Sequence, residues 1–203
     1  MAAPTDNFEP NGPLTEAHQL QLADAQRRAQ KIRGAARVAA FNGWMTGLFA
    51  VCSAPFALFS LSGLFVTVGL SVVAYNEFQG RKRLLQFDEQ APTFLGWNQL
   101  GFLALIVVYC LWMLAASLLG EGPISAELNA HPELGDALGS VAGLDQMFRW
   151  LMVAVYGSTI ALSVVFQGLA ALYYFRRQKQ VAEYVRGTPA WVISLQRLAA
   201  PSA

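Results

Sequence analysis

The stretch YNEFQGRKRLLQFDEQAPTFLGWNQ, residues 75–99, separates two long apolar segments of the chain. It opens and closes with amide and acid side chains and holds three consecutive basic residues between them. The amide and acid side chains are Asn76, Glu77, Asn98 and Gln99, and the basic residues are Arg81, Lys82 and Arg83. A basic stretch between two apolar runs is typical of a cytoplasmic loop between transmembrane helices. The sequence therefore predicts a helical hairpin whose turn, at residues 79–94, lies at the inner membrane surface.

The composition of the whole chain supports a membrane protein. Hydrophobic residues make up 55% of the 203 residues and charged residues 13%, about half the charged share of a soluble domain. The mean hydropathy of +0.37 indicates the same class. The net charge is only +1, so nothing in the overall charge favours a nucleic-acid partner.

Four segments are long and apolar enough to be predicted as transmembrane helices, since a spanning helix needs roughly 20 mostly apolar residues. They are residues 38–58, 60–78, 95–119 and 149–175. We therefore expect an all-α polytopic membrane protein, a four-transmembrane-helix bundle. The alternative, a soluble protein with buried helices, is disfavoured because such helices are rarely this long without a charged residue.

The turn between the first two spans is the least certain boundary, because no charged residue marks it. The sequence SLSG at residues 60–63 offers turn-forming residues and Ser60 as the N-cap of the second helix. The competing turn is SAPF at residues 53–56. The later turn is preferred because it leaves helices of similar length, with Pro55 near the end of the first.

The distribution of charge predicts the orientation. All of the 14 Lys and Arg residues except Arg149 lie before the first span, between spans two and three, or after span four. The loop 120–147 contains acidic residues and no Lys or Arg. Because basic loops stay in the cytoplasm, both termini are predicted to be cytoplasmic and the acidic loop external. The expected location is the plasma membrane of a bacterium, its inner membrane, with several spans.

Two segments outside the spans are predicted to be helical. Within the N-terminal region 1–36, a helix from about residue 14 is expected to lead into the first span, lying either on anionic headgroups or in solvent. In the C-terminal basic segment 176–203, Thr188 is expected to cap a short amphipathic helix. That helix is expected at the inner headgroups, or docked against the cytoplasmic ends of the spans.

Polar side chains near the inner ends of the spans form a predicted layer that we call the polar collar. Its members are Asn42, Asn76, Glu77, Asn98, Gln99, Tyr173 and Tyr174. Such groups are costly against lipid, so they should face one another. In one interpretation they stabilise the bundle, with Glu77 paired to Arg81 and Asn76 bonded to Asn98 or Gln99. In the other, the collar is a cytoplasm-facing site for a headgroup, an ion or a partner.

No residue set indicates catalysis, a cofactor or a metal. The external loop holds His131, Glu133 and Asp136, but their spacing matches no strong metal motif. The other histidine, His18, is predicted to lie on the opposite side of the membrane, which disfavours a nucleophilic pair. We therefore expect a protein that is not an enzyme.

The patterns NEFQGRKRLLQFDEQAP and LGWNQLG resemble a pattern in uncharacterised bacterial integral membrane proteins. An Asn-Glu pair, a Gly-Arg pair and an Asn-Gln pair recur there around the same cytoplasmic hinge. The resemblance covers residues 41–112 and implies a bacterial inner-membrane setting, with no activity attached.

Two functions remain open. The leading expectation is a scaffold or accessory subunit whose partners are the lipid bilayer, with its anionic inner headgroups, and either another membrane protein or further copies of the chain. The alternative is a small transporter or channel component, for which span four offers polar residues such as Ser163 and Gln167 nearer the bilayer centre.

Overall fold

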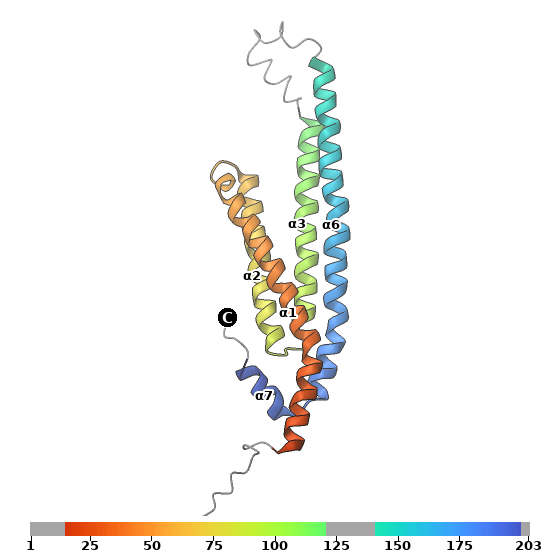
Figure 1. Cartoon of the computed structure of the whole chain (residues 1–203). Coiled ribbons are helices and arrows are strands. Elements are labelled where there is room, and N and C mark those ends of the chain that lie inside the picture. Colours follow the sequence, from red (N-terminus) through yellow and green to blue (C-terminus); the bar gives the residue numbers. More distant parts are fainter. Residues whose placement is uncertain (1–14, 121–140, 200–203) are drawn as a thin grey trace, which may run out of the picture.

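The computed structural model describes residues 15–120 and 141–199, and helices account for nearly all of them (Figure 1). These helices are α1 (Glu16–Ala57), α2 (Leu61–Leu85), α3 (Ala91–Leu119), α6 (Val141–Arg186) and α7 (Ala190–Leu198). No strand occurs in these two ranges. The predicted all-α class is therefore confirmed.

The helices form two antiparallel hairpins, one of α1 and α2 and one of α3 and α6 (Figure 1). The hairpins lie together at the end that holds α7 and move apart toward the turn between α1 and α2. We call the first end the base of the molecule and the second the open end. The first half of α1 and the last turns of α6 both belong to the base.

Three helices are long and apolar enough to cross a membrane: α2, α3 and residues Gly143–Arg186 of α6. The apolar part of α1, which was predicted as the first span, is not among them. Asn42, Thr46 and two glycines, Gly43 and Gly47, interrupt that part of the helix. The fourth span therefore stays a prediction.

The turn between α1 and α2 lies where the serine-rich sequence predicts it. Ser60 is the N-cap of α2, and its hydroxyl accepts a hydrogen bond from the Gly63 N–H at 3.0 Å. Pro55 lies inside the last turn of α1. The choice of SLSG over SAPF is confirmed.

The turn between α2 and α3 is shorter than predicted, because both helices extend into the hinge and leave only residues 86–90 between them. The N–H of Phe87 donates to the Leu84 carbonyl at 3.0 Å, and the N–H of Asp88 donates to the Arg83 carbonyl at 3.1 Å. This is the Schellman pattern, but Phe87, with φ 55°, occupies the left-handed position that usually holds glycine. The Phe87 ring is buried against Tyr184, with 4.9 Å between centroids, which offsets the unfavourable backbone conformation.

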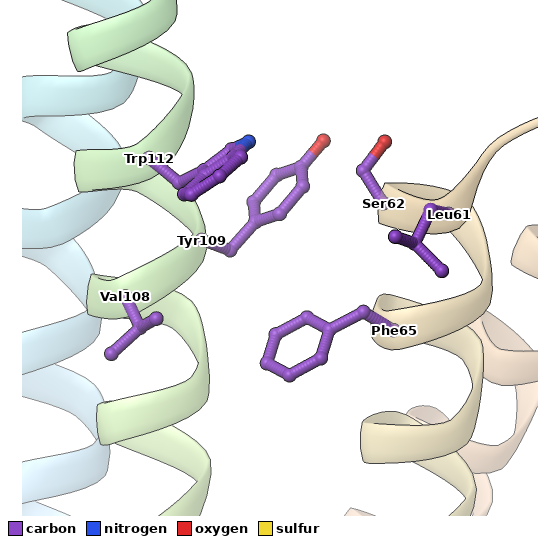
Figure 2. A pocket seen from close by; sticks show the side chains of 6 residues that line it. All are labelled: Leu61, Ser62, Phe65, Val108, Tyr109 and Trp112. Carbon is purple, nitrogen blue, oxygen red and sulfur yellow. The ribbon is translucent and has the colours of Figure 1, made fainter.

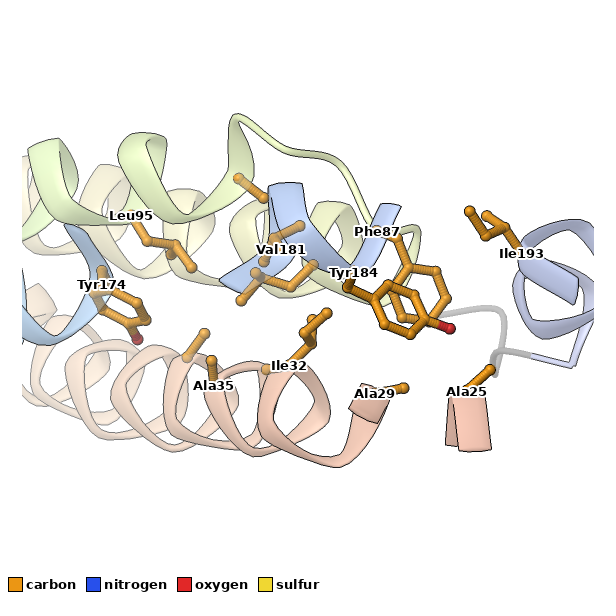
Figure 3. Close-up of a cluster of buried hydrophobic side chains, with 14 of the residues drawn as sticks. Ala25, Ala29, Ile32, Ala35, Phe87, Leu95, Tyr174, Val181, Tyr184 and Ile193 are labelled. Carbon is orange, nitrogen blue, oxygen red and sulfur yellow. The ribbon is translucent and has the colours of Figure 1, made fainter. Parts of the chain in front are cut away.

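The hydrophobic core lies in the base, below most of the apolar spans (Figure 3). Its contributors from α1 are mostly small: Ala25, Ala29, Ile32, Ala35, Ala36 and Ala39. Facing them are larger side chains from the other helices and the hinge, including Leu84, Phe87, Leu95, Tyr174, Val181, Tyr184, Val192 and Ile193. The small side chains let α1 approach its neighbours closely, and the larger ones fill the space between the helices.

The short helix α7 docks onto the base. Val192 is fully buried, and the Arg197 Nε–H donates to the Gln86 carbonyl at 2.8 Å. Docking was one of the two predicted positions of this helix. The predicted cap is wrong, however, because α7 begins at Ala190 with Pro189 as its N-cap, so Thr188 lies one residue too early.

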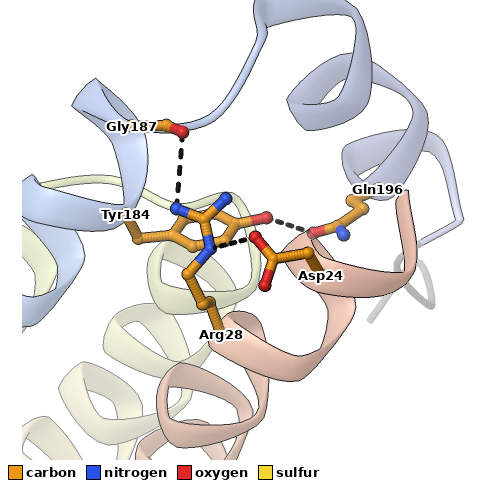
Figure 4. Close-up of polar contacts among 5 residues, drawn as sticks. All are labelled: Asp24, Arg28, Tyr184, Gly187 and Gln196. Carbon is orange, nitrogen blue, oxygen red and sulfur yellow. Dashed lines mark hydrogen bonds and ion pairs between the residues drawn. The ribbon is translucent and has the colours of Figure 1, made fainter. Parts of the chain in front are cut away.

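Polar contacts in the base tie α1 to the residue that follows α6, and α6 to α7 (Figure 4). Arg28 forms an ion pair with Asp24 at 3.0 Å, and its guanidinium donates to the Gly187 carbonyl at 3.3 Å. The Tyr184 hydroxyl donates to the Gln196 side-chain oxygen at 2.7 Å. The N-terminal half of α1 therefore packs one face on protein, where the sequence predicted only lipid or solvent around it.

Candidate functional site

The polar collar assembles around the carboxyl group of Glu77, which is fully buried. Oε1 of Glu77 accepts hydrogen bonds from the side-chain amides of Asn98 and Gln99, each at 2.8 Å. Oε2 accepts a longer one from the Tyr174 hydroxyl at 3.4 Å. Residues from α2, α3 and α6 thus meet at one carboxyl group.

Asn98 connects this carboxyl group to the backbone and to Asn76. Its amide nitrogen also donates to the Val73 carbonyl at 3.1 Å, and its oxygen accepts from the Asn76 amide at 3.1 Å. The amide therefore uses both of its N–H groups and its oxygen, the full capacity of the side chain apart from one lone pair. The predicted bond between Asn76 and Asn98 across the hairpin is confirmed.

Helix α1 joins the network at its outer edge. The Asn42 amide donates to the Tyr174 hydroxyl at 3.5 Å. Gly43, the next residue of α1, is buried beside α2, and a Cβ added there would lie 3.2 Å from the Cβ of Glu77. The glycine therefore allows a close contact between α1 and α2, as small residues do where helices pack in membranes.

Two predictions about the collar differ from the structure. Glu77 forms no ion pair with Arg81; its partners are the neutral side chains just described. The reason is the direction of the Glu77 side chain, which points into the bundle. Tyr173 forms no hydrogen bond with the collar; its ring packs against Tyr174 and under the guanidinium of Arg177, 4.8 Å away.

The three basic residues of the hinge lie in the last turns of α2 and take different positions. Arg83 stacks its guanidinium over the Phe94 ring at 4.7 Å. Lys82 is exposed, and Arg81 is half-buried and lines a cavity in the base. Together they form a basic rim a short distance below Glu77.

A groove of about 480 Å³ opens between the hairpins at the open end (Figure 2). One wall is formed by α2 and the other by α3, and the lining residues are Leu61, Ser62, Phe65, Val108, Tyr109 and Trp112. In Figure 2 the Ser62 hydroxyl, the Tyr109 hydroxyl and the Trp112 indole nitrogen point toward the same side of the groove, above the apolar Phe65 and Val108. The groove thus has an apolar lower part and a polar upper edge.

Sequence reasoning missed this groove and also the core of the base. A signal for the core was present, because Ala25, Ala29, Ile32, Ala36 and Ala39 recur at helical spacing. No comparable signal marked the groove, since its walls come from helices whose separation depends on the whole fold.

The described residues contain no group of three or more His, Cys, Asp or Glu side chains placed to hold a metal ion. The histidine and carboxylates of the acidic loop, residues 131–136, lie outside the described part of the chain. No family model, no curated protein and no solved structure matches this chain.

Proposed function

We propose that this chain is a non-enzymatic scaffold or accessory subunit of the bacterial inner membrane that holds a partner membrane helix in the groove between its two hairpins. The observation that carries the proposal is the groove itself. Two hairpins that are fixed together at the base leave an apolar, aromatic-lined space where a third helix could pack. Aromatic side chains such as Phe65 and Trp112 are typical anchors of helix contacts.

The proposal includes four spans, with the apolar part of α1 as the first. Its support is that α1 packs antiparallel along the full length of α2, which is apolar enough to cross the membrane. A helix that accompanies a spanning helix in this way lies at the same depth. Both termini are then cytoplasmic, because the basic residues gather at the base and the sequence between α3 and α6 is acidic, with no Lys or Arg at residues 120–140.

Site-specific photo-crosslinking in cells tests the scaffold function. The photoreactive amino acid p-benzoylphenylalanine replaces Phe65, which lines the groove, or Phe166, an exposed aromatic residue of α6 that does not line it. We expect a discrete protein adduct from position 65 and only lipid adducts from position 166. The mass of the adduct separates a partner protein from a second copy of the chain. Equal protein adducts at both positions, or none at either, would contradict the proposal.

Cysteine labelling tests the orientation after Cys52 and Cys110 have been replaced. Leu58→Cys lies in the turn at the open end and Leu198→Cys at the end of α7, and both positions are more than four-fifths exposed, at 83% and 86%. A reagent that does not cross membranes should label intact cells at position 58 only. Labelling at position 198 under the same conditions would show that the orientation is the reverse of the one proposed.

The buried carboxyl group of Glu77 favours a small transporter or channel component as the second candidate. Ionisable side chains within membrane segments often mark ion or proton pathways. Glu77→Gln distinguishes the two functions, because glutamine can keep accepting from Asn98 and Gln99 through its oxygen while its amide donates to the Tyr174 hydroxyl. A stable Glu77→Gln protein that has lost its cellular phenotype would favour transport; an active one favours the scaffold.

A further inference from the structure

A second cavity, of about 520 Å³, lies in the base between α1, α2 and α7. Its lining contains three arginines, Arg33 and Arg37 of α1 and Arg81 of α2, and no acidic residue. None of the three forms an ion pair within the described ranges. Arg33 and Arg37 are one helical turn apart, a spacing at which like charges destabilise a helix unless something between them compensates the charge.

Gln196 contributes an independent observation from the α7 side of the same cavity. Its side chain is only 5% exposed, and its oxygen accepts from the Tyr184 hydroxyl at 2.7 Å (Figure 4). The amide nitrogen is buried and has no hydrogen-bond partner among the residues that the structure describes. Buried N–H donors without an acceptor are rare in folded proteins, so a missing acceptor is expected beside it.

We propose that this cavity binds a phosphate group, held by the guanidinium groups of Arg33, Arg37 and Arg81 and by the side-chain amide of Gln196. Planar guanidinium groups bind phosphate through paired, charge-assisted hydrogen bonds, and the anion compensates the repulsion between the arginines. A phosphate oxygen supplies the acceptor that the Gln196 amide lacks. The site is separate from the groove of the proposed scaffold function, so each stands or falls alone.

A neighbouring cavity shows that positive side chains alone do not indicate a phosphate site. Arg27, Arg28 and Lys31 line a space of about 470 Å³ on another side of α1. That space also contains Glu183, and Arg28 is already paired with Asp24. Its positive charge is therefore partly compensated by carboxylates of the chain, whereas the cavity that Arg33, Arg37 and Arg81 line has no acidic residue.

The phosphate group could belong to a soluble molecule or to a lipid at the inner membrane surface. Full-length protein is therefore studied in two preparations. In nanodiscs of phosphatidylcholine, inorganic phosphate and glycerol 3-phosphate are titrated while the melting temperature is recorded. In detergent, phosphatidic acid or phosphatidylcholine is added, and bound lipid is counted by native mass spectrometry. Saturable binding of a soluble phosphate identifies a soluble ligand, and retention of phosphatidic acid alone identifies a lipid.

Arg81→Gln and Lys82→Gln form a matched pair, because both remove one positive charge from the same turn of α2 and only Arg81 lines the cavity. We expect Arg81→Gln to weaken phosphate binding by about tenfold or more, since a charge-assisted hydrogen bond is lost. Lys82→Gln should change binding by less than about twofold, as exposed charges contribute little. Equal weakening by both variants would overturn the site in favour of general surface attraction.

Gln196→Glu tests the same site in a variant that keeps the bond from Tyr184. The new carboxylate faces the three arginines, so the melting temperature without ligand should rise and the response to phosphate should vanish. An unchanged response of Gln196→Glu would overturn the proposal. Absence of saturable binding by inorganic phosphate, glycerol 3-phosphate and phosphatidic acid alike would overturn it too.

Discussion

The base and the open end of this molecule are stabilised in different ways. In the base, side chains from α1, α2, α3, α6 and α7 bury one another almost completely. Toward the open end, large apolar residues such as Phe59, Leu61 and Leu119 are more than four-fifths exposed, at 86%, 83% and 88%. Apolar side chains in water must pack on protein, whereas those in a bilayer are equally well solvated by lipid. The position of the core is therefore the one expected if the base lies in water and the apolar helices lie in lipid.

The collar lies at the boundary between these two regions. Glu77 receives hydrogen bonds from three residues on two other helices, and Asn42 extends the network to α1. Where lipid gives no net drive for helices to associate, such bonds and close packing at small residues hold them together. Above this level the hairpins part, and the groove opens.

The largest effect is expected for Glu77→Leu, which would show whether the collar is needed to join the base to the spans. The change removes the acceptor of one Asn98 N–H, of one Gln99 N–H and of the Tyr174 hydroxyl, at about 1–3 kcal/mol for each buried group left unpaired. Glu77→Gln, which retains most of the bonds, is the matched control. Thermal unfolding in detergent measures both. Similar melting temperatures for the two variants would mean that the collar does not stabilise the bundle.

Truncation of apolar side chains compares the two regions directly. Ile32→Ala removes a side chain that is 3% exposed in the base, and we expect it to lower the free energy of unfolding by about 2–5 kcal/mol. Leu111→Ala acts on α3 at a position that is 54% exposed, and its effect should stay within about 0.5 kcal/mol. Equal losses would show that the open end also has a protein core, formed with a partner or a second copy.

Alanine substitutions at two glycines compare a tightly packed position with an open one within the base. A Cβ at Gly80 would overlap a terminal carbon of Leu95, a side chain that is itself fully buried. Gly80→Ala should therefore destabilise by about 1–3 kcal/mol through overpacking. Gly34 has nothing within 4 Å, so Gly34→Ala should stabilise α1 by about 0.5–1 kcal/mol. Denaturant unfolding of the two variants checks the opposite signs.

The smallest effect is expected for the exposed ion pair between Asp24 and Arg28. Asp24→Asn removes the charge from a side chain that is 61% exposed, and exposed pairs contribute about 0.2–1 kcal/mol. Arg28 keeps its bond to the Gly187 carbonyl. A loss well above this range would mean that the ion pair is needed to hold α1 against α6.

Much of the collar was predictable, because residue type and depth are properties of the sequence. Asn76, Glu77, Asn98 and Gln99 flank one hinge, so a helical hairpin must bring them to one level. Which of them would meet was harder to predict, because the choice between Arg81 and the amides as partners of Glu77 depends on the direction of each side chain. That direction is set by how the helices are rotated about their axes.

The sequence by itself determined the helical class, the approximate positions of the apolar helices, the serine-capped turn and the gathering of basic residues at one end, because hydropathy, caps and charge act over short stretches of chain. Only the tertiary structure decided that the core lies in the base, that α7 brings Gln196 to Arg33 and Arg81, and that a groove separates α2 from α3. The residues next to an alanine stripe or an arginine in the sequence do not show which side chains it will contact. Its partner comes from a distant part of the chain. Turns such as the one at Phe87 determine which faces of the helices meet.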